Sequence, residues 1–421
     1  MRAYASILLA VAAAIAAPAT ITIENAYPSD ATGNPVPVQL GDSFYLTAKL
    51  NVDGPLLGPY RIRFDLPYLS RTTSLLGYDG EATVTWGPYP ALLEGPLKSK
   101  ATIQTSTDAA GQPFFFEVAS SAGTNGIEYF APRVLDGWLS ATANLVSGSS
   151  AGIQWYGPQP LTGGFQQVLT SWNDGSLVTS FPFGQPVVSV PNVDSVAQQF
   201  QIVASSCRAN ASILRSVTFD SYRSLSPGER KWLEPETLVE SRSREIAFFT
   251  SRILPREFRS RISPYDAARA LFQAVVARMT YATTPAKPDA LVALRTGRGD
   301  CSYFSALFVA CCRSAGIPAR SVCGMRLGDN AWHVWAEFFL PGPGWIPVDP
   351  EFCDEFSPDG SQALYFGTIP DLNGRCALSY GFDHSVNGRS IPMLQSPAIV
   401  TSGATRVRSV TPSCSLAVVG P

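Results

Sequence analysis

The chain has 421 residues, a formal net charge of -2 at pH 7, 45% hydrophobic residues and 15% charged residues. This length exceeds what one hydrophobic core usually organises, so we expect two or three domains. The balanced charge and the ample apolar content exclude an intrinsically disordered chain and give no electrostatic reason to bind nucleic acid or an anionic membrane.

The first residues have the pattern of a signal peptide. Arg2 supplies an early positive charge, an apolar run follows from Ile7 to Ala17, and Ala17 and Ala19 form an A-x-A cleavage site. We therefore expect residues 1–19 to be removed and the protein to be secreted, periplasmic or held at the cell surface. No later stretch approaches the roughly 20 apolar residues of a transmembrane helix. The alternative is an uncleaved N-terminal anchor.

Residues 20–191 read as a β-rich region. Short alternating or β-branched runs are broken there by Gly, Pro, Asn and Asp. The run "SFYLTAKL", which begins at Ser43, alternates as a half-buried strand does, and "NDG" at Asn173 to Gly175 predicts a hairpin between two strands. We interpret this region as a β-sandwich domain, or as two small ones.

Helical patterns appear after Pro191. The segment "SPYDAARALFQAVVARMTY" predicts an amphipathic helix with Ser263 as its N-cap and Pro264 in its first turn. A second apolar stripe follows Cys301 and predicts a helix that ends near Gly316.

Three strand-like runs come next, "ARSVCGM", "WHVWAEFFL" and "WIPVDP", and the turn "PGPG" joins the last two. A helix beside antiparallel strands is an α+β arrangement. We assign residues 205–390 to this domain and residues 391–421 to a β-rich C-terminal tail.

The stretch "GRGDCSYFSAL" places Cys301 at the start of the predicted helix. The free N–H groups and the dipole of a helix N-terminus favour a thiolate, so Cys301 is a candidate nucleophile of lowered pKa. Arg298, Gly299 and Asp300 also spell a tripeptide that adhesion ligands carry. We expect Asp300 to be the helix N-cap and Gly299 to let the backbone approach a substrate carbonyl, so this tripeptide is not a protruding loop.

Cysteine chemistry on an amide also requires a histidine that moves the proton and a group that orients the imidazole. The chain has two histidines, and one of them, His333, lies in the run "AWHVWAEFFL". The hairpin over "PGPG" returns a strand that ends in Asp349, within a few residues of His333 in register. The carboxylate of Asp349 could therefore accept the imidazole N–H. Core and turn roles for the three residues are the alternative interpretation.

Three phrases in this order resemble the transglutaminase-like superfamily: "SPYDAARALFQAVVARMTY", "RGDCSYFSALFVACCRSAGIPARSVCGM" and "NAWHVWAEFFLPGPGWIPVDPEF". The resemblance covers roughly residues 232 to 352. It implies a papain-like core in which the nucleophile helix packs on an antiparallel sheet, with Cys301, His333 and Asp349 as the catalytic triad.

The mechanism that the resemblance implies is acyl transfer. Cys301 attacks an amide or ester carbonyl, His333 protonates the leaving amine, and Asp349 fixes the imidazole tautomer. Water or an amine then resolves the thioester, and the sequence does not decide between hydrolysis and cross-linking. The backbone N–H of Cys301 is one oxyanion donor, and the second donor is not identifiable.

No cofactor or metal site is expected. His384 has no second histidine nearby, no C-x-x-C pair exists, and no Asp-rich loop of the calcium-binding type is present. Trp332 and Trp335 are interpreted as cleft walls or core. The cysteines other than Cys301 are expected to be bridged or buried, with at least one further free thiol, and their connectivity stays open.

Two functions from different classes remain. The first is an exported transglutaminase-like cysteine peptidase or acyltransferase that acts on a protein or peptide substrate. The second is a surface or periplasmic binding protein with an inactive core, in which the β-rich region recognises a protein or a cell-wall polymer. The order Cys301, His333, Asp349 favours the enzyme.

Overall fold

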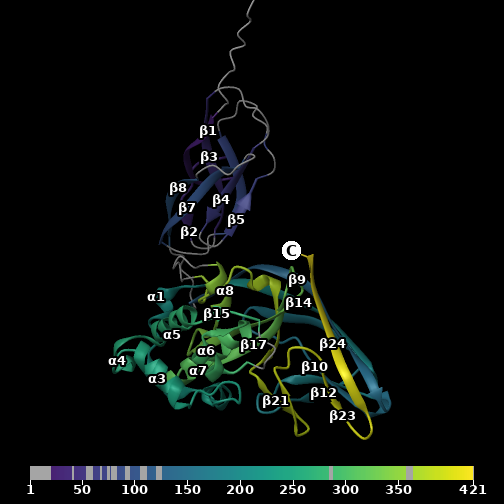
Figure 1. The fold of residues 1–421 in the computed structure, drawn as a ribbon. Helices are drawn as coiled ribbons and strands as arrows, with labels where there is room; N and C mark the ends of the chain where they lie inside the picture. The colour runs from purple at the N-terminus through teal and green to yellow at the C-terminus, as the bar shows by residue number, and fades with distance from the viewer. Residues whose placement is uncertain are drawn as a thin grey trace, which may run out of the picture. The chain divides into compact units, whose positions relative to one another are not determined.

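The computed structural model of the chain describes residues 20–39, 42–53, 60–66, 69–73, 76, 83–90, 95–104, 111–119, 126–283, 288–356 and 364–420. The predicted signal peptide, residues 1–19, lies outside them. The chain divides into two compact units, residues 1–120 and 121–421, which are both drawn in Figure 1. Among the described residues no helix is both long and apolar enough to cross a membrane.

Within the described residues of the first unit, the strands form two β-sheets. The three-stranded sheet has the order β1-β3-β6 and the five-stranded sheet has the order β2-β8-β7-β4-β5. Phe64 of β4 contacts Tyr89 of β6 edge to face, with ring centroids 6.4 Å apart, so the apolar core lies between the two sheets. The strands are β1 (Thr20–Ser29), β2 (Val38–Gln39), β3 (Ser43–Asp53), β4 (Arg61–Leu66), β5 (Leu69–Thr72), β6 (Thr83–Pro90), β7 (Gly95–Gln104) and β8 (Gln112–Ala119).

The second unit is α+β and contains three four-stranded sheets, with the orders β12-β13-β10-β23, β11-β14-β9-β24 and β19-β18-β17-β20. Two short pairs, β15-β16 and β21-β22, complete its strands. The strands are β9 (Ile127–Ser147), β10 (Ile153–Pro158), β11 (Gln166–Asn173), β12 (Ser176–Thr179), β13 (Pro186–Pro191), β14 (Ser195–Ala209), β15 (Thr280–Tyr281), β16 (Arg298–Gly299), β17 (Ala319–Arg326), β18 (Trp332–Leu340), β19 (Gly344–Val348), β20 (Arg375–Tyr380), β21 (Asp383–Val386), β22 (Arg389–Pro392), β23 (Ala398–Thr401) and β24 (Arg406–Gly420).

The helices of the second unit gather on one side of it, away from the long strands β9, β14 and β24 (Figure 1). They are α1 (Ala211–Leu214), α2 (Pro227–Arg230), α3 (Arg244–Ile253), α4 (Phe258–Arg261), α5 (Pro264–Arg278), α6 (Ala290–Thr296), α7 (Cys301–Ala315) and α8 (Pro350–Phe356), with short 3-10 turns at Ser150–Gly152, Phe219–Ser224, Lys231–Leu233 and Leu372–Gly374. The cap residues Ser263 of α5 and Gly316 of α7 are those expected from the sequence.

Helix α7 is the centre of the helical side. It packs on β17 and β18 and contacts α3, α5, α6 and α8. Nearly every residue of β17 and β18 is buried, as is typical of strands covered on both faces. The second face meets the β-rich side, where the Gln166 side chain of β11 donates hydrogen bonds to the carbonyls of Leu161 and Ala377.

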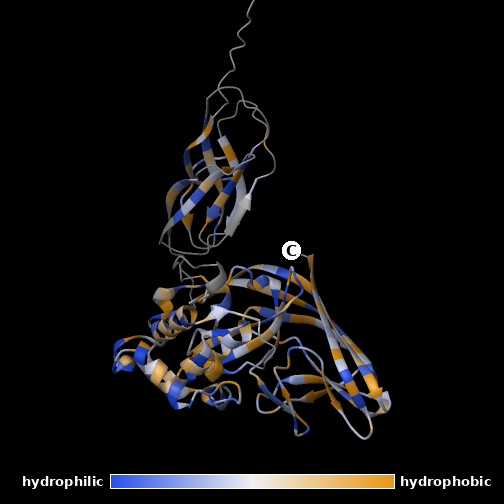
Figure 2. Cartoon of the chain, in the orientation of Figure 1, coloured by the Kyte–Doolittle hydropathy of each residue, from blue (hydrophilic) through white to orange (hydrophobic). Residues whose placement is uncertain are grey.

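The C-terminal strands complete sheets that begin more than two hundred residues earlier. Strand β24 pairs with β9 over most of its length, and β23 pairs with β10. Apolar and polar residues alternate along β24 (Figure 2), and its Cys414 and Leu416 are buried. The segment predicted as a tail after residue 391 is therefore an integral part of the second unit.

Two sequence-based expectations differ from this fold. The first unit ends at Ser120 and the strands from β9 onward belong to the second, whereas the sequence predicted one β-rich region up to residue 191. The hairpin predicted at Asn173 to Gly175 is wrong, because β11 pairs with β14 whereas β12 pairs with β13. The turn joins strands of two different sheets, because β11 pairs with the distant strand β14 whereas β12 pairs with β13, the strand that follows it.

Candidate active site

The N-terminus of α7 carries Cys301. Asp300 caps this helix, because its side chain accepts the backbone N–H of Ser302 at 3.0 Å. Gly299 is buried in β16, which pairs with β15. A Cβ atom at position 299 would lie 2.4 Å from Cβ of Tyr303. Glycine is thus required there by the packing of Tyr303. Arg298 and Gly299 form a paired strand and Asp300 caps a helix, so the tripeptide is not a protruding loop.

The thiol of Cys301 is half-buried. Burial, followed by the charge of Asp300, raises the pKa of the Cys301 thiol, and the backbone N–H of Val334 offsets part of that rise by hydrogen bonding to the sulfur. The lowered pKa expected from the helix N-terminus is therefore not found. The contact with Val334 places the sulfur beside the residue that follows His333.

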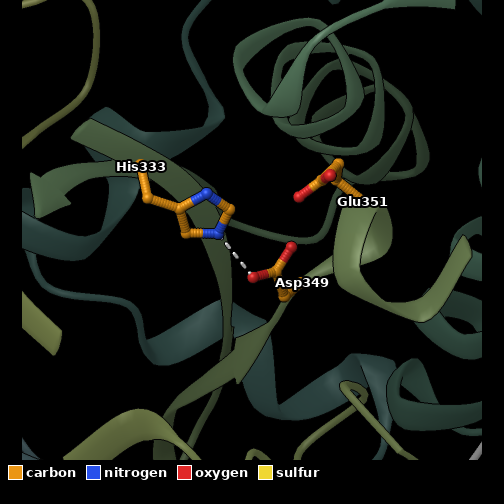
Figure 3. A group of neighbouring side chains, drawn as sticks. All are labelled: His333, Asp349 and Glu351. Atoms are coloured by element: carbon orange, nitrogen blue, oxygen red, sulfur yellow. Dashed lines mark hydrogen bonds and ion pairs between the residues drawn. The ribbon is translucent and has the colours of Figure 1, made fainter. Parts of the chain in front are cut away.

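His333 and Asp349 are hydrogen-bonded. The Nε2–H of His333 donates to Oδ2 of Asp349 at 2.7 Å, and both side chains are buried, as Figure 3 shows. The bond uses Nε2, which leaves Nδ1 of the imidazole for another partner. In the β18–β19 hairpin Ala336 pairs with Val348, so continuing this register would place Asp349 two positions from His333. The pair is therefore a diagonal one across the hairpin.

Asp349 is also the residue at which β19 becomes α8. Its Oδ1 atom accepts the backbone N–H of Phe352 at 3.2 Å, and its carbonyl accepts the N–H of Cys353 at 3.1 Å. With Pro350 as the first residue of α8, this is an N-cap followed by proline. One carboxylate oxygen thus caps the helix while the other faces the imidazole, so the helix start orients the acidic group.

A guanidinium group completes the surroundings of this carboxylate. Nη1 of Arg375, on β20, donates to Oδ2 of Asp349 at 2.5 Å. Burial alone would raise the pKa of Asp349, but the hydrogen bonds and charges of His333 and Arg375 outweigh it and hold that pKa well below its usual range. Asp349 is consequently a carboxylate at neutral pH.

Two aromatic rings hold the imidazole. The His333 ring lies 4.7 Å from the Phe352 ring, centroid to centroid, and stacks on Trp335 at 6.2 Å. Trp335 has no exposed surface, so it belongs to the core, while Trp332 is partly exposed at the start of β18. Trp335 thus agrees with the core interpretation made from the sequence, and a cleft-wall role of Trp332 stays a prediction.

Three side chains form a candidate metal centre. One ligand atom from each of His333, Asp349 and Glu351 lies within 4.8 Å of the others (Figure 3). A metal ion would compete for Oδ2 of Asp349, which already accepts from His333 and from Arg375. The buried cation of Arg375 also disfavours a second cation beside it. We therefore interpret the group as an acid–base site and not as a metal site.

His384 lies elsewhere. It is buried in β21 rather than in the loop expected from the sequence, and its ring nitrogens contact the hydroxyl of Ser180 at 3.3 Å and the carbonyl of Gly381 at 3.2 Å. A hollow of about 510 Å³ lies at the opposite end of α7 from Cys301, next to Gly316. Neither feature adjoins Cys301.

The remaining cysteines are all buried, and no disulfide joins any of the eight, every one of which falls among the described residues. Burial raises the pKa of Cys311 and of Cys207 to about 12. The thiols other than Cys301 are thus shielded, as the sequence suggested for those that are not bridged.

Sequence reasoning missed Arg375, Glu351 and the capping role of Asp349. The last could have been found, because "VDPEF" reads as an N-cap followed by proline. Glu351 lies in the same phrase without any spacing that marks it. Arg375 lies in "NGRCALSY" on a strand that pairs with β17, and nothing local connects it with Asp349.

Comparison with known proteins gives a family match inside the second unit. Residues 254–350 match the family described as "Transglutaminase-like superfamily". An uncharacterized protein of Haemophilus influenzae is 37% identical over 82 residues, an alignment that covers 13% of this chain and 22% of that protein. The aligned part is thus only about a fifth of that relative's length.

The chain also aligns with solved structures. A candidate cysteine protease from Cytophaga hutchinsonii has a TM-score of 0.49 and 13% identity, covering 69% of this chain and 92% of that one. The periplasmic domain of TgpA from Pseudomonas aeruginosa has a TM-score of 0.32 and 15% identity, covering 71% and 90%.

Proposed function

We propose that the protein is an exported cysteine enzyme of the transglutaminase-like superfamily, whose family model matches residues 254–350, and that it cleaves or transfers acyl groups at peptide or side-chain amides. Cys301 is the nucleophile, His333 the acid–base group and Asp349 the orienting carboxylate. One observation carries the proposal: the 2.7 Å hydrogen bond from His333 to Asp349, formed next to the strand residue whose N–H contacts the Cys301 sulfur.

The reaction begins with the thiol of Cys301 protonated. Because burial raises the pKa of the Cys301 thiol, the thiol passes its proton to Nδ1 of His333 as the sulfur attacks the carbonyl carbon. The carbonyl oxygen takes up the electron pair, and the N–H of Cys301 at the start of α7 is one donor to it. Collapse of this intermediate breaks the C–N bond while His333 returns the proton to the leaving amine.

The thioester is then resolved. His333 accepts a proton from the incoming water or amine, the new C–O or C–N bond forms, and the proton returns to the sulfur as it leaves. Asp349 keeps the imidazole in the tautomer with the proton on Nε2 throughout. Hydrolysis and transfer use these same groups and differ only in which acceptor reaches the thioester.

A tagged primary amine separates the two outcomes. Purified protein is incubated with a glutamine-rich protein and the tagged amine, and incorporation of the tag is followed beside release of new amino termini and of ammonia. Hydrolysis yields ammonia or new termini without incorporation, whereas transfer incorporates the tag. Loss of both signals in Cys301→Ala assigns them to this site. Either signal persisting in Cys301→Ala contradicts the proposal.

The β-rich part supports a second role, binding of a cell-wall polymer. In sheet β11-β14-β9-β24 Trp172 pairs with Gln199, and Gln199 pairs with Trp138. Directly paired residues share one face of a sheet, and all three side chains are exposed. The two indoles stand two strand spacings apart, about 10 Å, with an amide between them. Aromatic rings beside an amide suit a polysaccharide, because sugar rings stack on indoles and their hydroxyls bond to amides.

This role has its own test. Retention on purified peptidoglycan is measured for the full chain, for Trp138→Ala combined with Trp172→Ala, and for Leu177→Ala as a control. Leu177 is as exposed as the tryptophans but lies on β12, in another sheet. We expect the tryptophan variant alone to lose retention about tenfold. Equal retention of all three proteins would remove this role and leave the enzymatic proposal intact. We further infer that the first unit is a β-sandwich domain, and that residues 1–19 direct export and are then removed.

A further inference from the structure

The guanidinium of Arg375 joins two carboxylates. It has no exposed surface. Nη1 donates to Oδ2 of Asp349 at 2.5 Å, while Nε and Nη2 donate to Oδ2 of Asp371 at 3.1 and 2.9 Å. Its flat face lies over the rings of Phe352, at 4.7 Å, and Trp335, at 5.5 Å, and these are the two rings that hold the imidazole of His333.

We propose that Arg375 is a positioning residue of the reaction, which locks the carboxylate of Asp349 toward His333 and, by its charge, keeps the imidazole neutral at rest. This inference rests on the proposed function and concerns the same site. Arg375 lies outside the segment that matches the family, residues 254–350. It therefore adds to the site a residue from β20, which lies beyond β17 in the same sheet.

The positioning part follows from the hydrogen bonds of one carboxylate. Oδ1 of Asp349 is held by the N–H of Phe352, and Oδ2 is shared by His333 and Arg375. A carboxylate restrained at both oxygens cannot rotate without breaking a buried hydrogen bond. Charge-assisted bonds of this kind are stronger and more directional than neutral ones. Removing the guanidinium would free Oδ2 and loosen the ring that it orients.

The electrostatic part follows from the charges around the imidazole. An uncompensated buried carboxylate would favour the imidazolium and so occupy Nδ1 with a proton. The guanidinium sits on the same oxygen as the imidazole and offsets that effect, which leaves Nδ1 free to accept the thiol proton. Charged or titratable groups face this site from several parts of the chain. They are Cys301 and its cap Asp300 at the start of α7, Asp349 and Glu351 at the start of α8, Arg375 on β20, and Asp371 just before the turn that leads into β20.

The chain supplies a matched control. Arg326 of β17 pairs with Arg375 in the sheet and lies over the same Phe352 ring, at 4.9 Å. It bonds to Asp329 at 3.1 Å and not to Asp349. Replacing Arg326 thus removes an arginine from the same ring without touching the carboxylate that orients His333.

The experiment measures single-turnover acylation by an activated ester from pH 5 to 9 for wild type, Arg375→Met, Arg375→Lys, Asp371→Asn and Arg326→Met. We expect Arg375→Met to acylate about tenfold to hundredfold more slowly, with the acid limb of its profile moved up by on the order of one pH unit, since the imidazole then gains a proton more easily. Arg375→Lys keeps the positive charge. The acid limb of its pH profile should therefore stay near that of wild type, although its acylation rate falls.

The other variants complete the test. Asp371→Asn loosens the guanidinium of Arg375 but keeps the charge of that guanidinium. We therefore expect a small loss of acylation rate and no upward shift of the acid limb. Arg326→Met should match wild type. A loss that is equal at every pH in Arg375→Met would contradict the charge role, and a wild-type rate would contradict the positioning role. If Arg375→Met does not fold, Arg375→Lys and Asp371→Asn decide: wild-type rates in both overturn the proposal. Acylation of Cys301→Ala would instead overturn the proposed function itself.

Discussion

The two histidines of this chain are both buried on strands, and their surroundings differ in charge. His333 on β18 bonds to a carboxylate that a guanidinium also contacts. His384 on β21 contacts a hydroxyl and a backbone carbonyl, and packs edge to face on Phe183 with centroids 5.3 Å apart. One ring has charged partners, whereas the other has neutral ones.

This difference distinguishes a candidate acid–base histidine from a structural one. Burial lowers the pKa of His384, and its partners satisfy a neutral ring, so nothing around it uses a proton transfer. The ring of His333 keeps Nδ1 free of Asp349 and lies beside the start of the helix that carries Cys301. A buried histidine acquires chemistry when a charged group fixes one nitrogen and a nucleophile adjoins the other.

The largest expected effect comes from removing the reacting groups. Cys301→Ala and His333→Ala should each lower turnover of an activated ester by about 10⁶-fold, because a nucleophile and its base fail together. His384→Ala should keep turnover near that of wild type. Since it leaves a buried cavity, its turnover is measured well below its melting temperature, with folding checked by circular dichroism. Loss of turnover in His384→Ala with retention in His333→Ala would reverse the assignment.

The next effect concerns the orienting carboxylates. Asp349→Ala should reduce turnover by about 10⁴-fold, less than the loss of the nucleophile, because the carboxylate positions the imidazole and forms no bond to substrate. Asp383→Ala removes the carboxylate next to His384 and should leave turnover unchanged. Steady-state turnover of the two variants at matched folding makes this comparison. Equal losses in both would show that the carboxylate at Asp349 has no special role.

Thiol reactivity extends the comparison to two cysteines. Cys301 and Cys311 lie on the same helix, but only the first is partly exposed. Peptide mapping after mild iodoacetamide treatment should find the label at Cys301 and not at Cys311. Burial raises the pKa of the Cys301 thiol, so labelling should rise about tenfold per pH unit through neutral pH. Labelling that is already maximal at pH 6 would instead indicate a resting thiolate.

The smallest effect is a dependence of stability on pH. Because the folded pKa of His384 is depressed, the unfolded chain binds a proton there more readily. The stability from this group is fully present above the unfolded pKa, near 6.5, and is lost as pH falls toward the folded pKa. Urea unfolding at pH 7.5 and 5.5 should show a larger loss for wild type than for His384→Gln, by no more than about 1.4 kcal/mol per pH unit. Equal losses would contradict this.

Much of the site could be predicted from local sequence. The cap at Asp300, the end of α7 at Gly316 and the bounds of β18 all follow from patterns within a few residues. The family match over residues 254–350 agrees with the phrases that carry the resemblance. The roles of Cys301, His333 and Asp349 in catalysis stay predictions.

The features of the fold and of the site that could not be predicted depend on contacts between distant segments. Strand β24 meets β9, and the partner of Asp349 is an arginine on β20. No run of residues encodes either contact. The sequence therefore predicted a boundary near residue 191 and left Arg375 out of the site for the same reason, which is that both depend on contacts between distant segments. The pKa of the Cys301 thiol depends likewise on burial, which only the packed fold determines.

The most direct test is the covalent intermediate. Wild type, His384→Ala and His333→Ala are mixed with a slowly released acyl ester and quenched in acid, and each protein is then analysed by intact mass and peptide mapping. The account predicts a single acyl group on the peptide that contains Cys301 in wild type and in His384→Ala, and none in His333→Ala on the same timescale. An acyl group on any other residue, or on Cys301 at the wild-type rate without His333, would contradict it.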